Sequence, residues 1–136
     1  MTPTSLELPR AVSRAALERF GEPSRTFTYD ARAARVAPPH DHLEVMVWHP
    51  TDELEMTTLM TIGMSALAVP TARHRVELVF SVGRAVSEQE ERACSSFLAN
   101  MAGYPWDHQC ALDFWHRLRN PGPIPCFPRC QAIIFH

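Results

Sequence analysis

The segment 58-TLMTIGMSALAVP-70 joins a buried-strand pattern to an abrupt turn. The β-branched residues at its start favour extended backbone. Gly63 interrupts them, and a glycine within a strand typically marks a bulge or a close approach of another chain segment. We expect Met64 to make an adaptable apolar contact and Ser65 to satisfy the polar groups of the turn. The segment therefore predicts a strand over residues 56–64 that ends in a glycine-dependent turn.

Strands of the same kind are predicted on both sides of this segment. Aliphatic residues alternate with other residues over 42–48, which indicates a strand with its aliphatic face on the core. Residues 75–82 show a similar alternation, and a short edge strand is predicted within 24–36. Because neighbouring strands are joined by short connections, we expect an antiparallel meander.

Helices are predicted before and after these strands. Residues 8–21 carry an apolar stripe at helical spacing and end in glycine, a typical helix stop. The residues 87-SEQE-90 form a capping box at the start of a second helix, which Gly103 closes. The apolar segment 131-QAIIF-135 is predicted as a last strand inside the sheet. The pattern predicts an α+β fold, in which helices pack against a central, mostly antiparallel mixed sheet.

The composition fits a single domain over residues 1–136 and excludes several classes of function. A net charge of -2 provides no positive field for nucleic acid or for an anionic membrane surface. All 13 basic residues are arginine, so mechanisms that need a lysine amine are excluded. No apolar run is long enough for a signal peptide or a bilayer span, which favours a cytoplasmic protein.

Two groups of residues resemble sets of metal ligands. His40, His42 and Glu44 have the spacing that places alternate side chains on one face of a strand, where three ligands could hold zinc. This interpretation gives the alternative function, a small metal-dependent hydrolase in which zinc activates water. Cys126 and Cys130 form half of a zinc motif, with no second pair to complete it. We instead expect all four cysteines to be buried thiols, and we predict neither a bound metal nor another cofactor.

The Gly-Met-Ser of the opening segment is not a nucleophile elbow. That motif is G-x-S-x-G, and Leu67 stands where its second glycine is required. The chain has only 5 glycines, and none of its segments resembles a phosphate-binding loop. The sequence thus offers no catalytic set, and we predict that the protein is not an enzyme.

The order of the segments resembles that of a known family. The segments that carry the resemblance are 42-HLEVMVWHPT-51, 59-LMTIGMS-65 with its Thr61 and Gly63, Glu77-Leu78, 98-LANMAGYPWD-107 and 114-FWHRLRNPGPIP-125. This succession is similar to the bacterial single-domain branch of the suppressor-of-fused family over residues 39–135. The segment 59–65 is its most specific mark, whereas Glu44 replaces the usual Asp and residues 115–118 lack a Gly and a Thr of the family pattern. The resemblance implies an α+β fold with a mostly antiparallel sheet.

The resemblance also implies a function. Bacterial single-domain relatives are commonly proposed to be immunity proteins that bind and block a cognate toxin, a role that needs no catalytic residue. We therefore predict a non-enzymatic protein-binding module whose partner is a toxin domain. The sequence is also compatible with a homo-oligomer that forms through an edge strand. The predicted binding surface is the outer sheet face with the adjoining turn, and consists of His42, Glu44, Trp48, Met64, Ser65 and His116.

Overall fold

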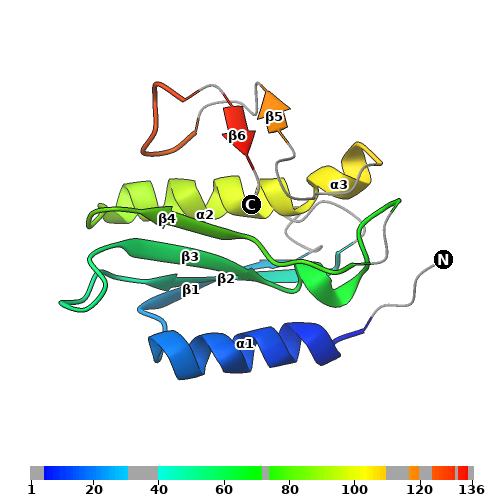
Figure 1. Cartoon of the computed structure of the whole chain (residues 1–136), viewed down its shortest axis with the longest axis horizontal. Coiled ribbons are helices and arrows are strands. Elements are labelled where there is room, and N and C mark those ends of the chain that lie inside the picture. Colours follow the sequence, from blue (N-terminus) through cyan, green and yellow to red (C-terminus); the bar gives the residue numbers. More distant parts are fainter. Residues whose placement is uncertain are drawn as a thin grey trace.

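In this computed structural model a four-stranded sheet lies between two helices (Figure 1). The structure describes residues 5–30, 40–71, 74–109, 117–119, 124–130 and 132–134. In chain order the elements are α1 (Glu7–Phe20), β1 (Arg25–Asp30), β2 (His42–Trp48), β3 (Thr57–Ile62), the 3-10 helix η2 (Met64–Ala66), β4 (Val79–Val82), α2 (Glu88–Ala102), α3 (Tyr104–Asp107), β5 (Arg117–Arg119) and β6 (Ala132–Ile134). The predicted α+β fold is confirmed. Within the described residues, no helix combines the length and the apolar character that a membrane span requires.

The four strands run antiparallel in the order β1-β2-β3-β4, so the predicted meander is confirmed. Val45 pairs with Phe27 on one side and with Thr61 on the other, which sets the register of the first three strands. β1 lies at an edge of this sheet, as expected for residues 24–36. β4 is shorter than the predicted segment 75–82, because the residues that precede it contact the turn after β3 instead.

The prediction that residues 131–135 form a strand inside this sheet is wrong. β6 pairs with β5 in a separate two-stranded antiparallel sheet, in which Ile134 lies opposite Arg117. In Figure 1 this small sheet lies beyond α2, on the side away from the four strands. β2 and β3, the inner strands of the larger sheet, each have both neighbours already in place.

The sheet face that meets α2 holds the main core. Its buried members come from alternate positions of the strands and from one side of the helix, and include Leu43, Val45, Val47, Leu59, Cys94 and Leu98. The predicted aliphatic face of 42–48 is thereby confirmed. Burial of one large aliphatic side chain stabilises a fold by about 1.5–3 kcal/mol, so this layer fixes α2 against the strands.

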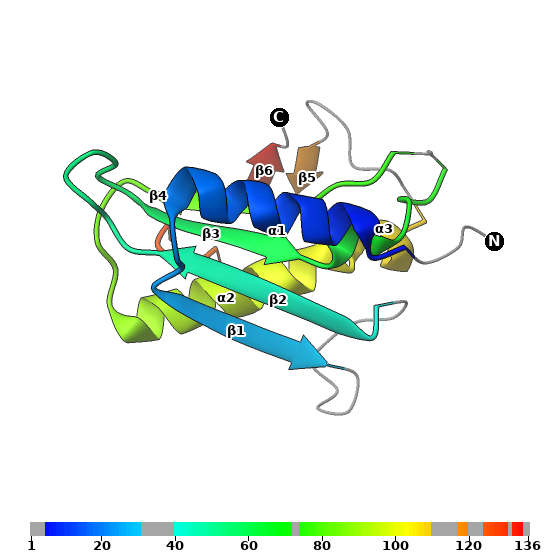
Figure 2. The same ribbon diagram turned by 90° about the horizontal axis from the view of Figure 1, so that it is seen from below.

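The helix α1 covers the opposite face of the sheet (Figure 2). Ala16 and Phe20, which lie on one side of α1, pack in a second cluster with Met46, Trp48 and Ile62. The rings of Phe20 and Trp48 are 5.2 Å apart between centroids. The second half of β2 is therefore buried on both faces, whereas the start of β2 is covered on one face only.

The first turn of α2 is fixed by a capping box and by a buried carboxylate. The backbone N–H of Glu90 donates to Ser87 Oγ at 3.1 Å, and the backbone N–H of Ser87 donates to Glu90 Oε1 at 3.0 Å, as predicted. Glu91 is 2% exposed and lies 3.0 Å from Arg25 Nε and 2.9 Å from His49 Nε2. These contacts join the start of α2 to β1 and to the residue that follows β2.

Candidate functional site

The turn after β3 depends on Gly63. Its φ of +125° lies in a region that L side chains rarely adopt. A Cβ at this position would stand 2.9 Å from the His42 carbonyl oxygen and 3.5 Å from Leu43 Cα, both backbone atoms of the neighbouring segment. Gly63 therefore allows two backbone segments to approach each other closely, as predicted.

Glu77 binds the amides of this turn. Its carboxylate accepts the backbone N–H groups of Gly63 and Ser65, each at 3.1 Å. The hydroxyl groups of Ser65 and Thr61 also donate to it, at 3.4 and 3.5 Å. Burial raises the pKa of Glu77 to about 7, although the backbone N–H groups favour its charged form. Glu77 thus satisfies donors that the turn would otherwise leave without partners.

Two other side chains satisfy the carbonyl groups of the turn. His40 Nε2 donates to the Met64 carbonyl at 3.1 Å, and Arg75 Nη1 donates to the carbonyls of Ser65, at 3.2 Å, and of Ala66. Because a carbonyl only accepts, Nε2 carries the proton of the His40 ring, and burial lowers the pKa of this histidine. The turn is therefore held inside the fold by side chains from other segments of the chain.

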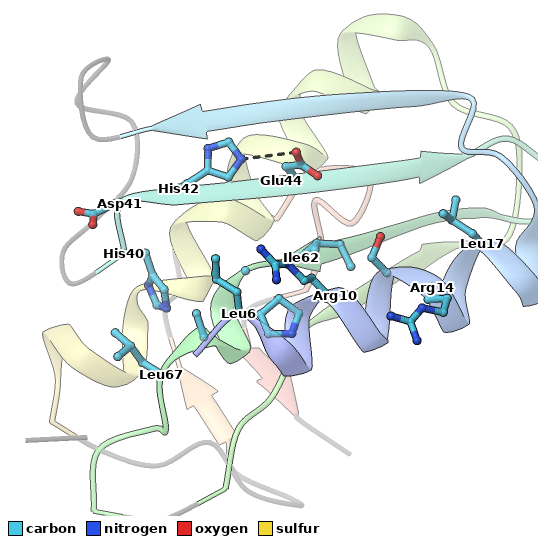
Figure 3. Close-up of a pocket in the computed structure, with 14 residues that line it drawn as sticks. Leu6, Arg10, Arg14, Leu17, His40, Asp41, His42, Glu44, Ile62 and Leu67 are labelled. Carbon is cyan, nitrogen blue, oxygen red and sulfur yellow. Dashed lines mark hydrogen bonds and ion pairs between the residues drawn. The ribbon is translucent and has the colours of Figure 1, made fainter. Parts of the chain in front are cut away.

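A groove opens beside this turn, between α1 and the start of β2 (Figure 3). Its volume is about 820 Å³. α1 forms one wall, residues 40–44 form the other, and residues 62–67 lie between the two. The lining residues are Leu6, Pro9, Arg10, Ser13, Arg14, Leu17, His40, Asp41, His42, Glu44, Ile62, Gly63, Ala66 and Leu67.

Arg10 and Arg14 provide the charge of the helix wall. They are one helical turn apart and therefore share a side of α1, next to the stripe in which Pro9 and Ala16 are buried. Both side chains are exposed. Within the described part of the chain, neither guanidinium has a carboxylate or another hydrogen-bond acceptor as its partner. The helix wall thus presents to the groove two cations that have no partner among the described residues.

The sheet wall carries acidic and polar groups. His42 Nε2 lies 3.4 Å from Glu44 Oε1, so the prediction that these two side chains share a face is confirmed. The side chains are 55% and 34% exposed, and the neighbouring Asp41 is exposed as well. Ile62 between the walls and Leu17 on α1 add apolar area to the lining. The groove therefore separates cations on α1 from carboxylates on the sheet side.

Three residues of the predicted binding surface are buried, so their expected exposure is wrong. Trp48 is covered by α1, and its Nε1 donates to the Gly21 carbonyl at 3.0 Å. Met64 and Ser65 are each 0% exposed, because the core and the side chains around the turn enclose them. His116 lies outside the described residues. Among the described residues of the predicted surface, His42 and Glu44 remain accessible, and both line the groove.

The helix wall was not among the sequence predictions. Arg10 and Arg14 belong to the predicted helix over 8–21, whose apolar stripe was the only feature assigned to it. Their spacing of four residues was the available signal, because it places two like charges on one side of a helix. No feature of the sequence near these arginines indicates that this side of the helix faces the start of β2.

The predicted zinc ligands do not come together. His40 precedes β2 and turns inward, with its ring centroid 4.6 Å from that of Trp106. The prediction that it shares a face with His42 and Glu44 is therefore wrong. In the part of the chain that the structure describes, no three His, Cys, Asp or Glu residues are grouped as metal ligands.

The cysteines differ in their surroundings. Cys94 is buried, and its Sγ lies 3.7 Å from that of Cys126. Burial raises the pKa of both thiols, that of Cys94 to about 12, and a protonated thiol is a poor nucleophile and metal ligand. The expectation of buried cysteines is wrong for Cys130, which is exposed, while Cys110 lies outside the described residues.

The fold and the groove together define an α+β domain with an open surface cleft. Residues 39–135 match the family model of the Suppressor of fused protein (SUFU), so the chain belongs to this family. SUFU domains are non-catalytic protein-interaction domains, and membership indicates a protein-interaction module. No similar chain was found among the curated proteins or among the solved structures. The matched residues include the sheet wall of the groove, whereas α1 with Arg10 and Arg14 precedes them.

Proposed function

We propose that this protein is a non-enzymatic immunity protein, which binds a cognate bacterial toxin in the cytoplasm and neutralises it. The observation that carries the proposal is the groove of about 820 Å³, whose two exposed arginines have no partner within the described residues. Arginine is enriched among the residues that dominate binding energy at protein interfaces. Membership of a protein-interaction family supports the same conclusion.

The groove offers the kinds of contact that a protein partner uses. Leu17 and Ile62 provide apolar area, while Arg10 and Arg14 on one side and Glu44 on the other provide charged groups for orientation. A standard interface buries about 800 Å² on each partner, so the partner must also cover surface beyond the groove. His42 and the exposed threonines of β1 extend the same face toward the sheet edge.

Neutralisation through this surface requires no chemical step. An inhibitor that covers an active site or its approach blocks the toxin for as long as the complex lasts. The residence time of such a complex is set mainly by its dissociation rate. Selection for an immunity protein would therefore act on the complementarity of the surface, and a catalytic residue would add nothing.

Co-expression with the product of the adjacent gene tests this function. We expect the adjacent gene to encode a toxin domain that arrests the growth of a host lacking this protein, and we expect co-expression of the protein to restore growth. A catalytically inactive toxin variant provides the control that separates binding from toxicity. Light scattering after size-exclusion chromatography should then detect a complex of the two chains.

Two outcomes would contradict the proposal. One is an adjacent toxin that kills equally well with and without the protein. The other is a chain that forms only homo-oligomers and never a mixed complex, which would instead assign the exposed surface to self-association.

A further inference from the structure

We infer that the groove binds an extended acidic segment of the partner protein, whose carboxylates pair with Arg10 and Arg14. This inference rests on the proposed function, because it specifies the chemistry of the partner at the same site. Its starting point is the contrast among the arginines of the described chain. Arg25, Arg84 and Arg92 each lie within 2.7–3.1 Å of a glutamate oxygen, whereas Arg10, Arg14 and Arg19 have no carboxylate partner among the described residues. Of these three, only Arg10 and Arg14 line the groove.

The spacing of the two arginines favours an anion. Guanidinium groups one helical turn apart repel each other, and a carboxylate placed between them replaces this repulsion by attraction. A guanidinium can also bind a carboxylate through two parallel hydrogen bonds, which fixes the orientation of the bound group. Because α1 is held by its buried stripe, Arg10 and Arg14 start from a fixed backbone, and binding orders only their side chains.

The opposite wall restricts which anion fits. Glu44 lines the groove across from the arginines, and Asp41 lies at the end of the same wall, so these carboxylates would repel a ligand that carries negative charge on both sides. A nucleic acid, with a charge at every phosphate, is disfavoured for this reason. A peptide in extended conformation sends successive side chains to opposite sides, so it can direct carboxylates to α1 and hydrogen-bond donors to the sheet wall.

The apolar lining residues of the groove favour the same occupant. Ile62 lies between the two walls and Leu17 lies on α1 beyond Arg14, with Leu6 and Leu67 among the other apolar lining residues. An aliphatic side chain of the segment can cover these apolar residues and remove water from the arginine-carboxylate pairs, which strengthens them. We therefore expect a short segment that combines acidic residues with one or two aliphatic ones.

Selection from a random dodecapeptide library displayed on phage tests this assignment with the full chain as the target. Peptides enriched on the wild type should be rich in Asp and Glu. A synthetic copy of the most enriched peptide should bind the wild type with an affinity that decreases with salt. In fluorescence anisotropy the double variant Arg10→Gln/Arg14→Gln should bind it at least ~10-fold more weakly.

Arg19→Gln is the matched control, because Arg19 is exposed on the same helix but does not line the groove. It should bind the peptide like the wild type, and circular dichroism should give the same spectrum for all three proteins. The inference is overturned if the library enriches no peptides, if the enriched peptides are not acidic, or if the double variant binds them as tightly as the wild type. Tighter binding of an RNA oligonucleotide than of any peptide would also overturn it.

The experiment separates this inference from the proposed function. If the double variant still neutralises the toxin at wild-type levels, the inference that an acidic segment binds through Arg10 and Arg14 is wrong, while the immunity function stands. If acidic peptides bind through Arg10 and Arg14 but no toxin is neutralised, the chemistry of the groove stands and the immunity function is wrong.

Discussion

The substitution Gly63→Ala should destabilise the protein strongly, and the structure provides a second glycine for comparison. Gly63 has a φ of +125°, and Gly21, which follows α1, has a φ of +79°. Both backbone conformations disfavour an L side chain. They differ in the space around the added methyl group, because a Cβ on Gly21 would meet nothing within 4 Å, whereas a Cβ on Gly63 would lie 2.9 Å from the His42 carbonyl oxygen.

The expected magnitudes follow from these two geometries. Backbone strain of this kind costs about 1–3 kcal/mol, and this is the whole cost expected for Gly21→Ala. At Gly63 the close contact adds a further ~1–3 kcal/mol, because the oxygen belongs to the backbone and cannot move without displacing the sheet. Since small domains are stable by only about 5–15 kcal/mol, Gly63→Ala should remove a large part of the stability.

Urea unfolding of the wild type and of the two alanine variants, followed by circular dichroism, gives the free energies of unfolding. The expected order of stability is wild type, then Gly21→Ala, then Gly63→Ala. Equal losses in the two variants would refute the reasoning, because the close backbone contacts at Gly63 are expected to add to the cost there and Gly21 has none.

Three further predictions concern the carboxylates and the hydroxyl around the turn and α2. Because the pKa of Glu77 is raised to about 7, the folded state binds its proton more tightly than the unfolded state. The free energy of unfolding of the wild type, relative to that of Glu77→Gln, should therefore fall by up to about 3 kcal/mol as the pH rises from 4.5 through 7. A difference between the two proteins that does not change with pH would be inconsistent with this pKa. Ser65→Ala should cost only about 1 kcal/mol in urea unfolding, because the hydroxyl contact with Glu77 is long at 3.4 Å, and a loss of partner binding without unfolding would contradict a structural role. Glu91→Ala should destabilise the protein by about 1–3 kcal/mol, because it removes the buried carboxylate that joins Arg25 and His49 while Arg25 keeps its contact with Glu88, and the exposed Glu88→Ala in the same helix should lower the melting temperature far less.

Local patterns predicted most of the fold because each pattern reports a local interaction. The alternation over 42–48 reports which side chains face α2, and the capping box at Ser87 and Glu90 satisfies amides within one turn. Strand pairing is not local in this sense. The apolar run at 131–135 indicates a strand, but nothing within it distinguishes β5 from an inner strand of the larger sheet as its partner.

The site was harder to predict, because its residues come from segments far apart in the chain. The Gly-Met-Ser turn has the composition of an exposed loop, and its burial depends on His40, Arg75 and Glu77, which lie outside it. Trp48 similarly alternates as an outward-facing residue until α1 packs over it. His42 and Glu44 were predicted as surface residues, since their placement depends only on the period of one strand.

The central claim is that a partner protein binds in the groove beside α1, and isothermal titration of the protein with the toxin domain encoded by the adjacent gene tests it most directly. A single-site complex with a Kd on the order of nanomolar is expected for an interface of standard size with good complementarity. Arg10→Gln/Arg14→Gln should weaken it at least ~10-fold while Arg19→Gln leaves it unchanged. The absence of any binding, or equal affinity of all three proteins for the toxin, would contradict the claim.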